Sequence, residues 1–168
     1  NKFGFGAKTN IDAEESNGLV PNEKWKLGYI GEFWFKGDSI NLGIGQGYML
    51  STPIQISQAI AVIANRGDII KPRLVEEIDE TPTELESLGK INLKDETNWE
   101  KIEKSMIEVI NAPNGTANNI KDTRYVIAGK TGTAQIKSYE DQEYEDIREN
   151  PFFRDHALFV GYAPIPDP

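Results

Sequence analysis

The clearest pattern in the chain is a run of apolar residues with the spacing of an α-helix, within residues 51–68. Thr52 stands where an N-cap is expected, Pro53 occupies the first helical position, and Gln55 completes a capping box. Gly67 is expected to end the helix in a left-handed conformation. The apolar side chains cover most of the helix circumference, which predicts a central buried helix. They are Ile54, Ile56, Ile60, Val62 and Ile63.

A second helix is predicted from about residue 96 to residue 111, because apolar residues recur on one face with charges opposite. These apolar residues are Trp99, Ile102, Met106, Val109 and Ile110. The sequence APNGTA then breaks the helical pattern. β-branched and aromatic residues predict extended structure in three segments, residues 69–78, 124–136 and 156–164.

The remaining segments predict irregular structure. Residues 1–51 are rich in glycine and aromatic residues, and are predicted to form loops with short extended pieces. Residues 76–96 carry many acidic residues together with Pro82 and Gly89, so they are predicted to be a surface excursion. The acidic run 140–149 is predicted to be a solvated loop between two strands.

The amino-acid composition of the chain argues against several classes of function. A chain of 168 residues is long enough for one domain with a core. It has 27 acidic and 18 basic residues and a formal charge of −9, which argues against a nucleic-acid-binding protein. With no cysteine and one histidine, cysteine catalysis and most zinc sites are excluded. No apolar run has the length needed to span a bilayer.

The segment YVIAGKTGTAQ, residues 125–135, fits two kinds of enzyme. Read as Gly-Lys-Thr, it could end a phosphate-binding loop, but that loop needs a glycine five residues before Gly129, where the chain has Arg124. The segment after the lysine also continues an extended pattern instead of opening a helix. The sequence GIGQGY fails the dinucleotide fingerprint, because Tyr48 stands in place of its last glycine. Both nucleotide-binding interpretations are weak.

Read as Lys-Thr-Gly, the same segment fits the third sequence motif of penicillin-binding proteins and serine β-lactamases. That motif needs an edge strand that presents an ammonium group and hydroxyl groups to a cleft. In a regular strand Lys130 and Gly132 share one face, whereas Thr131 and Thr133 share the other. Strict alternation would separate the lysine from the threonines. A twisted edge strand reconciles them by using backbone groups on one side and side chains on the other.

The neighbouring segments decide between the two interpretations. The segments NLGIGQGYMLSTPIQISQAIAVIANRG, APNGTA, AGKTGTAQ and RDHALFVGYAP occur in this order, after FGFGAKTNIDAEESNGLVPNEKWK. Together they closely resemble the penicillin-binding protein 2 family, the elongation-type class B transpeptidases of bacterial cell walls. The resemblance runs from Lys2 to Pro164 and is weakest in the acidic stretches.

The resemblance implies an α/β (α+β) fold of the penicillin-binding transpeptidase and serine β-lactamase type, an antiparallel sheet flanked by helices. In that family the motifs Ser-x-x-Lys and Ser-x-Asn precede Lys-Thr-Gly. We therefore expect residues 1–168 to be the part of one transpeptidase domain that holds the third motif. The first two motifs are expected upstream of Asn1, and the last strand and closing helix beyond Pro168. Such a piece would be inactive alone, and its incomplete sheet would leave edges unpaired.

The resemblance also assigns roles to four residues. Lys130 would supply positive charge beside the serine of the middle motif. The hydroxyl groups of Thr131 and Thr133 would bind the terminal carboxylate of a D-Ala-D-Ala stem peptide or of a β-lactam. The backbone N–H of Thr133 would be one donor to the oxyanion, and Gly132 would permit close approach of the substrate backbone. No metal and no cofactor are expected.

Two further motif matches are interpreted as coincidences. Ser87–Lys90 fits Ser-x-x-Lys and Ser39–Asn41 fits Ser-x-Asn, but they occur in the reverse of the family's order. A catalytic serine should also open a buried helix, whereas the sequence around Ser87 is charged. His156 has no recognisable nucleophile partner and is predicted to pack rather than to act in catalysis. The aromatic residues of EFWFKGD are predicted to anchor a loop onto the core, with sugar stacking as the alternative.

The function implied is cross-linking of peptidoglycan stem peptides through a serine acyl-enzyme during cell elongation. The implied partners are a membrane glycan polymerase of the elongation machinery and its shape-determining scaffold proteins. A single upstream anchor would hold the protein in the cytoplasmic (inner) membrane, with the catalytic domain on the periplasmic face. Three alternatives stay open: a D,D-carboxypeptidase or β-lactamase-like hydrolase, a non-catalytic penicillin-binding sensor or scaffold, and an NTPase.

Overall fold

The computed structural model describes residues 2–135, 152 and 154–165. The chain divides into two compact units, Asn1–Met106 and Ile107–Pro168. The elements in chain order are α1 (Glu23–Trp25), the π-helical turn η1 (Lys26–Ile30), α2 (Lys36–Gly43), α3 (Pro53–Ala64), β1 (Asp68–Ile70), β2 (Glu77–Ile78), β3 (Thr81–Pro82), β4 (Ser87–Lys90), α4 (Thr97–Asn111), the 3₁₀ turn η2 (Asn118–Ile120), β5 (Val126–Ala134) and β6 (His156–Ile165). The strands form three antiparallel pairs, β1 with β4, β2 with β3, and β5 with β6. This mixture of helices and small antiparallel sheets confirms the predicted α/β (α+β) class.

Helix α3 begins as its sequence predicts. The Thr52 N–H donates to Gln55 Oε1 over 3.0 Å, and the Gln55 N–H donates to Thr52 Oγ1 over 3.3 Å, which is the reciprocal capping box. Gly67 has a φ of +101°, and a side chain there would clash with the backbone oxygen of Ile91. The predicted start of this helix is therefore confirmed, whereas the first left-handed residue after the C-cap Asn65 is Arg66, with a φ of +50°.

The burial of α3 differs from the prediction. Gln55, Gln58, Ala59 and Val62 are buried, whereas its four isoleucines are only half-buried. Gln55 is fully buried, and its Nε2 donates to the carbonyl oxygens of Ala7 and Asn17 over 2.7 and 2.9 Å. A polar side chain thus occupies the inner face, because two loop carbonyls need a donor there.

The apolar core of the first unit is small. Val62 packs with Ile91 and Trp99, and a ring of partly buried residues surrounds them. These are Phe3, Ile63, Ile69 and Leu93. Trp99 comes from the predicted second helix, α4, whose apolar residues Met106 and Ile110 are also buried. Ile102 of the same predicted face is 39% exposed.

Residues 1–51 contain helices that the sequence interpretation missed. Elements α1, η1 and α2 lie in this segment, where loops with short extended pieces were predicted. Lys26 is only 3% exposed, and its Nζ lies 2.9 and 3.1 Å from the two carboxylate oxygens of Asp38. A contact between residues 12 positions apart therefore ties η1 to α2, and local propensity does not reveal such a contact.

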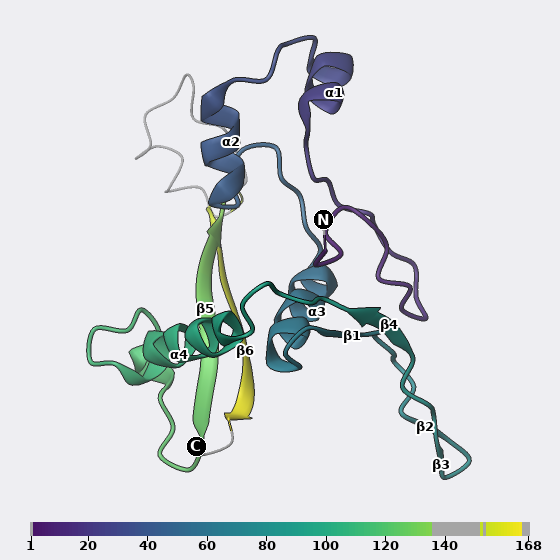
Figure 1. The fold of residues 1–168 in the computed structure, drawn as a ribbon, viewed down its shortest axis with the longest axis vertical. Helices are drawn as coiled ribbons and strands as arrows, with labels where there is room; N and C mark the ends of the chain where they lie inside the picture. Colours follow the sequence, from purple (N-terminus) through teal and green to yellow (C-terminus); the bar gives the residue numbers. More distant parts are fainter. Residues whose placement is uncertain (1, 136–151, 153, 166–168) are drawn as a thin grey trace. The chain divides into compact units, whose positions relative to one another are not determined.

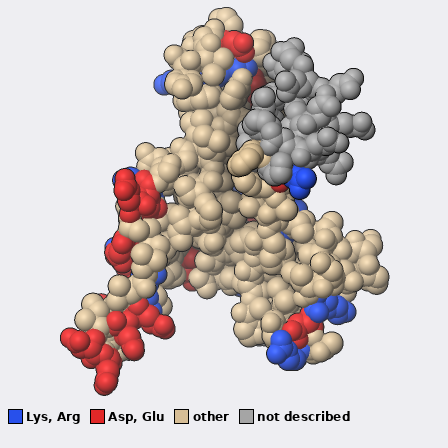
Figure 2. Space-filling view, turned by 180° about the vertical axis from the view of Figure 1, so that it is seen from behind, with Lys and Arg blue, Asp and Glu red and all other residues tan. Residues whose placement is uncertain are grey.

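The hairpin of β2 and β3 projects from the rest of the first unit (Figure 1). Its two turn residues, Asp79 and Glu80, have φ angles of +49° and +61°, as a two-residue type I′ turn requires. Its exposed acidic residues include Glu76, Glu77, Asp79, Glu80 and Glu84. Figure 2 shows acidic side chains gathered over this projecting end. The predicted acidic surface excursion over residues 76–96 is confirmed for the hairpin, but not for Ile91, which is 4% exposed and belongs to the core.

In the second unit β5 and β6 run side by side as a long antiparallel pair (Figure 1). Gly129 faces Gly161, and Lys130 faces Val160. A Cβ at Gly129 would lie 2.5 Å from Cζ of Phe159, so this glycine lets the phenyl ring cross the strand. Both predicted strands are confirmed. In the described part of the chain no helix is long and apolar enough to span a membrane.

Candidate active site

Strand β5 presents the Lys-Thr-Gly-Thr segment near its C-terminal end. Lys130, Gly132 and Thr133 are exposed, and Thr131 is half-buried. The Lys130 Nζ donates to the carbonyl oxygen of Thr131 over 2.7 Å, so the ammonium group lies along the strand. This bond joins the lysine head to the backbone of the next residue and not to a threonine hydroxyl group.

One edge of β5 is covered by β6, in a register that continues through Thr133 and Ala157. No other strand among the described residues pairs with the second edge of β5. An edge strand of this kind leaves backbone N–H and C=O groups for a further partner. This is the geometry that the third motif requires of its strand.

The hydroxyl group of Thr131 contacts a second threonine, which follows helix α4. Its Oγ1 lies 3.0 Å from Oγ1 of Thr116, a residue 15 positions earlier in the chain. Thr116 belongs to the sequence APNGTA, one of the segments that carry the family resemblance. The structure thus adds to the candidate site a residue without a chemical signal in the sequence.

The loop that carries Thr116 is fixed to the end of α4. The Ala117 N–H donates to the carbonyl oxygen of Val109 over 3.0 Å. The Asn118 Nδ2 donates to the carbonyl oxygens of Ile110 and Ala112 over 3.0 and 2.9 Å. These bonds satisfy carbonyl groups that a helix end leaves unpaired. They also hold the loop in one conformation.

A further bond ties the same helix end to the strand. The Asn111 Nδ2 donates to the carbonyl oxygen of Ile107 over 2.9 Å and to that of Ile127 over 3.3 Å. Ile127 lies on β5, three residues before Lys130. The end of α4, the Thr116 loop and β5 therefore form one hydrogen-bonded assembly.

The glycines of the segment differ in what surrounds them. A Cβ at Gly129 would meet the Phe159 ring, whereas a Cβ at Gly132 would lie 3.7 Å from Cβ of Leu158, an ordinary contact. Packing within the described residues therefore requires glycine at position 129 but not at 132. A requirement for glycine at 132 would have to come from a molecule that approaches the strand.

The two motif matches that are interpreted as coincidences lie in surroundings that do not suit a catalytic serine. Ser87 and Lys90 lie on β4, which is exposed throughout, and not at the start of a buried helix. The Lys90 Nζ lies 3.1 Å from Oδ1 of Asp68. In the second match, Oγ of Ser39 accepts a hydrogen bond from Nε1 of Trp34 over 2.9 Å. Neither serine contacts a lysine in the bonds that the structure shows for it.

Three other candidates are placed as follows. His156 is exposed at the start of β6, so the prediction that it packs into the fold is wrong. Phe33 and Phe35 are 73% and 61% exposed, so the prediction that they anchor a loop by burial is also wrong. The acidic run 140–149 lies outside the described residues.

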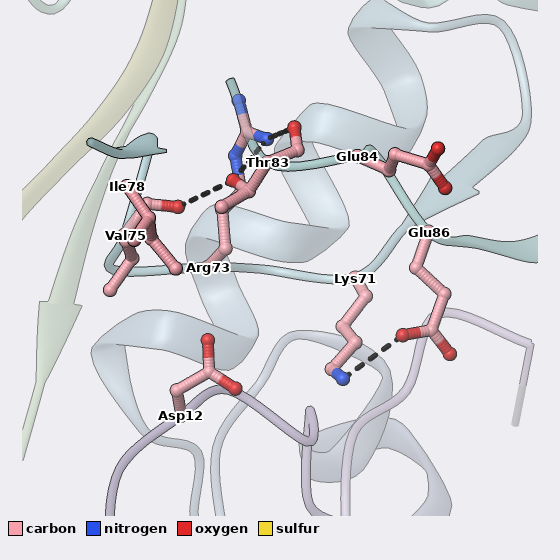
Figure 3. Close-up of a pocket in the computed structure, with 8 residues that line it drawn as sticks. All are labelled: Asp12, Lys71, Arg73, Val75, Ile78, Thr83, Glu84 and Glu86. Atoms are coloured by element: carbon pink, nitrogen blue, oxygen red, sulfur yellow. Dashed lines mark hydrogen bonds and ion pairs between the residues drawn. The ribbon is translucent and has the colours of Figure 1, made fainter. Parts of the chain in front are cut away.

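The first unit contains a hollow of about 240 Å³ beside the β2–β3 hairpin (Figure 3). Its two cations have partners: the Lys71 Nζ lies 3.0 Å from Glu86 Oε2, and Arg73 Nη1 donates to Oγ1 of Thr83 over 2.8 Å. The hydrogen bond to Glu86 raises the pKa of Lys71. This hollow is thus held together by pairs of its own side chains. Among the described residues, no three His, Cys, Asp or Glu side chains are grouped to hold a metal ion.

Comparison with known proteins gives a consistent result. The family of the penicillin-binding protein transpeptidase domain matches residues 1–168. The chain belongs to this family. The peptidoglycan D,D-transpeptidase MrdA of Acinetobacter baumannii is 39% identical over 173 aligned residues, which cover 99% of this chain and 25% of that protein. The chain thus spans about a quarter of the length of this relative.

Solved structures of the transpeptidase family show the same fold. The crystal structure of Pseudomonas aeruginosa PBP2 in complex with WCK 5153 has a TM-score of 0.79 and 40% identity, and the alignment covers 97% of this chain and 34% of that one. A complex between PBP2 and MreC from Helicobacter pylori gives a TM-score of 0.77 and 29% identity, over 97% of this chain and 28% of that one. The predicted transpeptidase fold and the resemblance to penicillin-binding protein 2 are confirmed.

Proposed function

We propose that this chain is part of a peptidoglycan D,D-transpeptidase of the elongation type, which cross-links stem peptides and is a target of β-lactams. One observation carries the proposal. An exposed Lys-Thr-Gly-Thr segment, Lys130–Thr133, lies on an edge strand of a chain that matches the transpeptidase family throughout. Relatives named peptidoglycan D,D-transpeptidase support the same activity.

In this proposal each residue of the segment has a defined task, and Thr133 has two. Lys130 supplies a positive charge that stabilises the negative charge developing at the reacting centre. The hydroxyl groups of Thr131 and Thr133 bind the terminal carboxylate of the substrate, and the backbone N–H of Thr133 donates to the oxyanion. Gly132 lets the substrate backbone approach the strand, because it presents no side chain there.

The proposed reaction is acyl transfer through a serine ester. The serine oxygen attacks the carbonyl carbon of the penultimate D-Ala, and the peptide bond to the terminal D-Ala breaks. The terminal D-Ala takes a proton and leaves. The amine of a second stem peptide then attacks the ester, which forms the cross-link and returns a proton to the serine oxygen. The residues described here bind and orient the substrate and stabilise its oxyanion.

The nucleophile belongs to a different segment in this proposal. Residues 1–168 form the part of the domain that holds the third motif, and Ser-x-x-Lys and Ser-x-Asn lie upstream of Asn1. The H. pylori structure of PBP2 with MreC supports a scaffold protein as partner. A glycan polymerase is proposed as the second partner. An upstream anchor would hold the protein in the cytoplasmic membrane, with the catalytic domain on its periplasmic face.

The test is an assay of products formed by the full-length gene product from glycan strands whose stem peptides end in D-Ala-D-Ala. The proposal expects cross-linked dimers and free D-Ala, and a penicillin should block both. Stem peptides shortened by one D-Ala without dimers would instead show a hydrolase. Neither product, with penicillin bound, would show a sensor or scaffold. The Lys130→Ala variant should form no dimers above background.

A further inference from the structure

We propose that Thr116 is a positioning residue for the Thr131 hydroxyl group, and orients its single proton toward the carboxylate of the bound substrate. The inference rests on the proposed function, because it assumes that Thr131 binds that carboxylate. It adds a residue outside the Lys-Thr-Gly-Thr segment, contributed by the loop that follows α4.

The first step is the geometry of the two hydroxyl groups. Their oxygens lie 3.0 Å apart, so one of the two must donate a hydrogen bond to the other. A threonine hydroxyl has one proton and two acceptor lone pairs. Thr131 can donate to a carboxylate only if its own proton does not point at Thr116. Thr116 is therefore the donor in the substrate-bound state, and Thr131 accepts from it while donating to the carboxylate.

The second step is the strength of two hydrogen bonds in series, from Thr116 to Thr131 and from Thr131 to the carboxylate. A hydrogen bond from a hydroxyl group to a carboxylate is shorter and stronger than one between neutral groups. A hydroxyl group that accepts one bond is polarised and donates more strongly in the next. The contact with Thr116 thus strengthens the bond to the substrate and removes the competing orientations of the Thr131 proton.

The third step is the rigidity of the Thr116 loop. A side chain on Gly115 would clash with the backbone oxygen of Val109, so the loop passes directly against the helix end. The neighbouring Ala117 is 4% exposed, and Asn118 bonds two carbonyl groups of the helix end. Asn111 joins the same helix end to β5. Thr116 is therefore held at a fixed place relative to Thr131 before any substrate binds.

The fourth step is that the contact between Thr116 and Thr131 contributes little to the stability of the fold. Thr116 is exposed and Thr131 is half-buried, so water would replace the bond between them if either hydroxyl were removed. An exchange of this kind changes the stability of the fold only slightly. The contact is expected to act mainly on the binding of the carboxylate.

The experiment uses the full-length gene product and measures the second-order rate of acylation by benzylpenicillin and by its methyl ester, which lacks the anionic carboxylate. The variants are Thr116→Val, Thr116→Ser, Thr131→Val and the double variant Thr116→Val/Thr131→Val. The exposed Thr123 gives a matched Thr123→Val control in the same unit. Thermal unfolding of each variant is recorded, and Thr116→Ala replaces Thr116→Val if the latter does not fold.

We expect Thr116→Val to slow acylation by benzylpenicillin about 3- to 10-fold, the size of one hydrogen bond between neutral groups. Acylation by the methyl ester should change less than about twofold, because the ester offers no carboxylate to the oriented proton. Thr116→Ser should restore the rate with benzylpenicillin, and Thr123→Val should have no effect. The double variant should react as slowly as Thr131→Val alone, because the two residues act as one unit.

Two results would overturn the inference. If Thr131→Val slows acylation by benzylpenicillin and Thr116→Val does not, then Thr116 does not position Thr131. If Thr116→Val slows the acid and the ester equally, its role is structural. The proposed function itself can fail with a different result. If Thr131→Val has no effect on acylation by benzylpenicillin, Thr131 does not bind the carboxylate. The positioning role of Thr116 is then excluded as well.

Discussion

Strands β4 and β5 each carry a segment that matches a motif of the transpeptidase family, but their surroundings differ. On β4, Ser87–Lys90 pairs with a three-residue strand and is exposed along its whole length. On β5, Lys130–Thr133 lies within a nine-residue strand that pairs with a ten-residue partner. The Lys90 ammonium group pairs with a surface carboxylate, whereas Thr131 contacts a residue fixed at the end of a helix.

The difference shows what turns a short motif into part of a site. Ser87 Oγ accepts a bond from the N–H of Gly89, two residues away, so this side-chain contact is local to its own strand. Thr131 is held through Thr116, Asn118 and Asn111, which lie in a different part of the sequence. A site needs side chains in fixed positions, and packing and hydrogen bonds from neighbouring elements supply them.

The largest effect on the rate of acylation is expected for substitution of Lys130, with Lys90 on β4 as the comparison. In the full-length gene product, Lys130→Ala should lower the rate of acylation by benzylpenicillin about 100- to 1,000-fold, as loss of a group that stabilises developing charge does. Lys90→Ala should leave the rate unchanged, because its ammonium group pairs with Asp68 at the surface. The rates are measured by intact-protein mass spectrometry. Equal losses in the two variants would contradict the comparison.

The two glycines of β5 are expected to have different roles, Gly129 in packing of the fold and Gly132 in binding of the substrate. Gly129→Ala should destabilise the protein by about 1–3 kcal/mol, because the new methyl group would overlap the Phe159 ring. Gly132→Ala should leave the unfolding temperature unchanged and slow acylation roughly 10- to 100-fold, since substrate would be displaced from the strand. Thermal unfolding and acylation are measured on both variants. A large loss of stability in Gly132→Ala would show that its glycine is required by packing.

A third lysine, Lys26, offers a structural contrast to Lys130. Its hydrogen bond to Asp38 raises the pKa of Lys26, and the same bond, with the N–H of Phe35, holds the pKa of Asp38 below its ordinary value. The Asp38 contribution to stability is present above the unfolded pKa of about 3.9, and is lost as the pH falls through the lower folded pKa. The Lys26 contribution is present below about pH 10.4, and is lost as the pH rises through its raised folded pKa.

The variant Asp38→Asn should therefore lower the unfolding temperature between about pH 4 and pH 10. The difference from the unaltered protein should shrink as the pH falls from about 4 through the lowered folded pKa of Asp38. Acylation by benzylpenicillin at neutral pH serves as the second readout and should keep its rate in the folded fraction. A difference in stability that is constant from pH 2 to pH 7 would rule out the ion pair as its cause.

The smallest effect is expected at the surface pair of β4. The side chains of Lys90 and Asp68 are 48% and 50% exposed. Asp68→Asn should change the free energy of unfolding by less than about 1 kcal/mol, and high salt should remove the difference. Denaturant titration at low and high salt measures both. A larger effect that persists in high salt would mean that β4 is held more firmly than its exposure indicates.

Several parts of the fold could be predicted from local sequence. The capping box of α3, the strand at Val126–Ala134 and the long helix at Thr97–Asn111 all appear where the sequence predicts them. Each has a local cause, such as a cap residue or a run of β-branched residues. The candidate site segment was recognised in the same way, because its four residues are consecutive, and its role stays a prediction.

The parts that were missed depend on contacts between distant residues. Helix α2 has two glycines among its eight residues and is held by Asp38 against Lys26, so its local pattern is not helical. The bond between Thr116 and Thr131 is invisible in the sequence, because nothing in APNGTA specifies which strand it faces. Buried Gln55 was recognised only as a cap, since its two loop carbonyl partners lie 38 and 48 residues away.

The most direct test of the central claim is to identify the acylated residue. The full-length gene product is incubated with benzylpenicillin and digested, and the modified peptide is sequenced by mass spectrometry. The account predicts a single acylated serine outside these 168 residues, and much slower labelling of the same serine in the Lys130→Ala variant. Label on Ser87 or Ser39 would contradict it, because a motif taken for a coincidence would then hold the nucleophile.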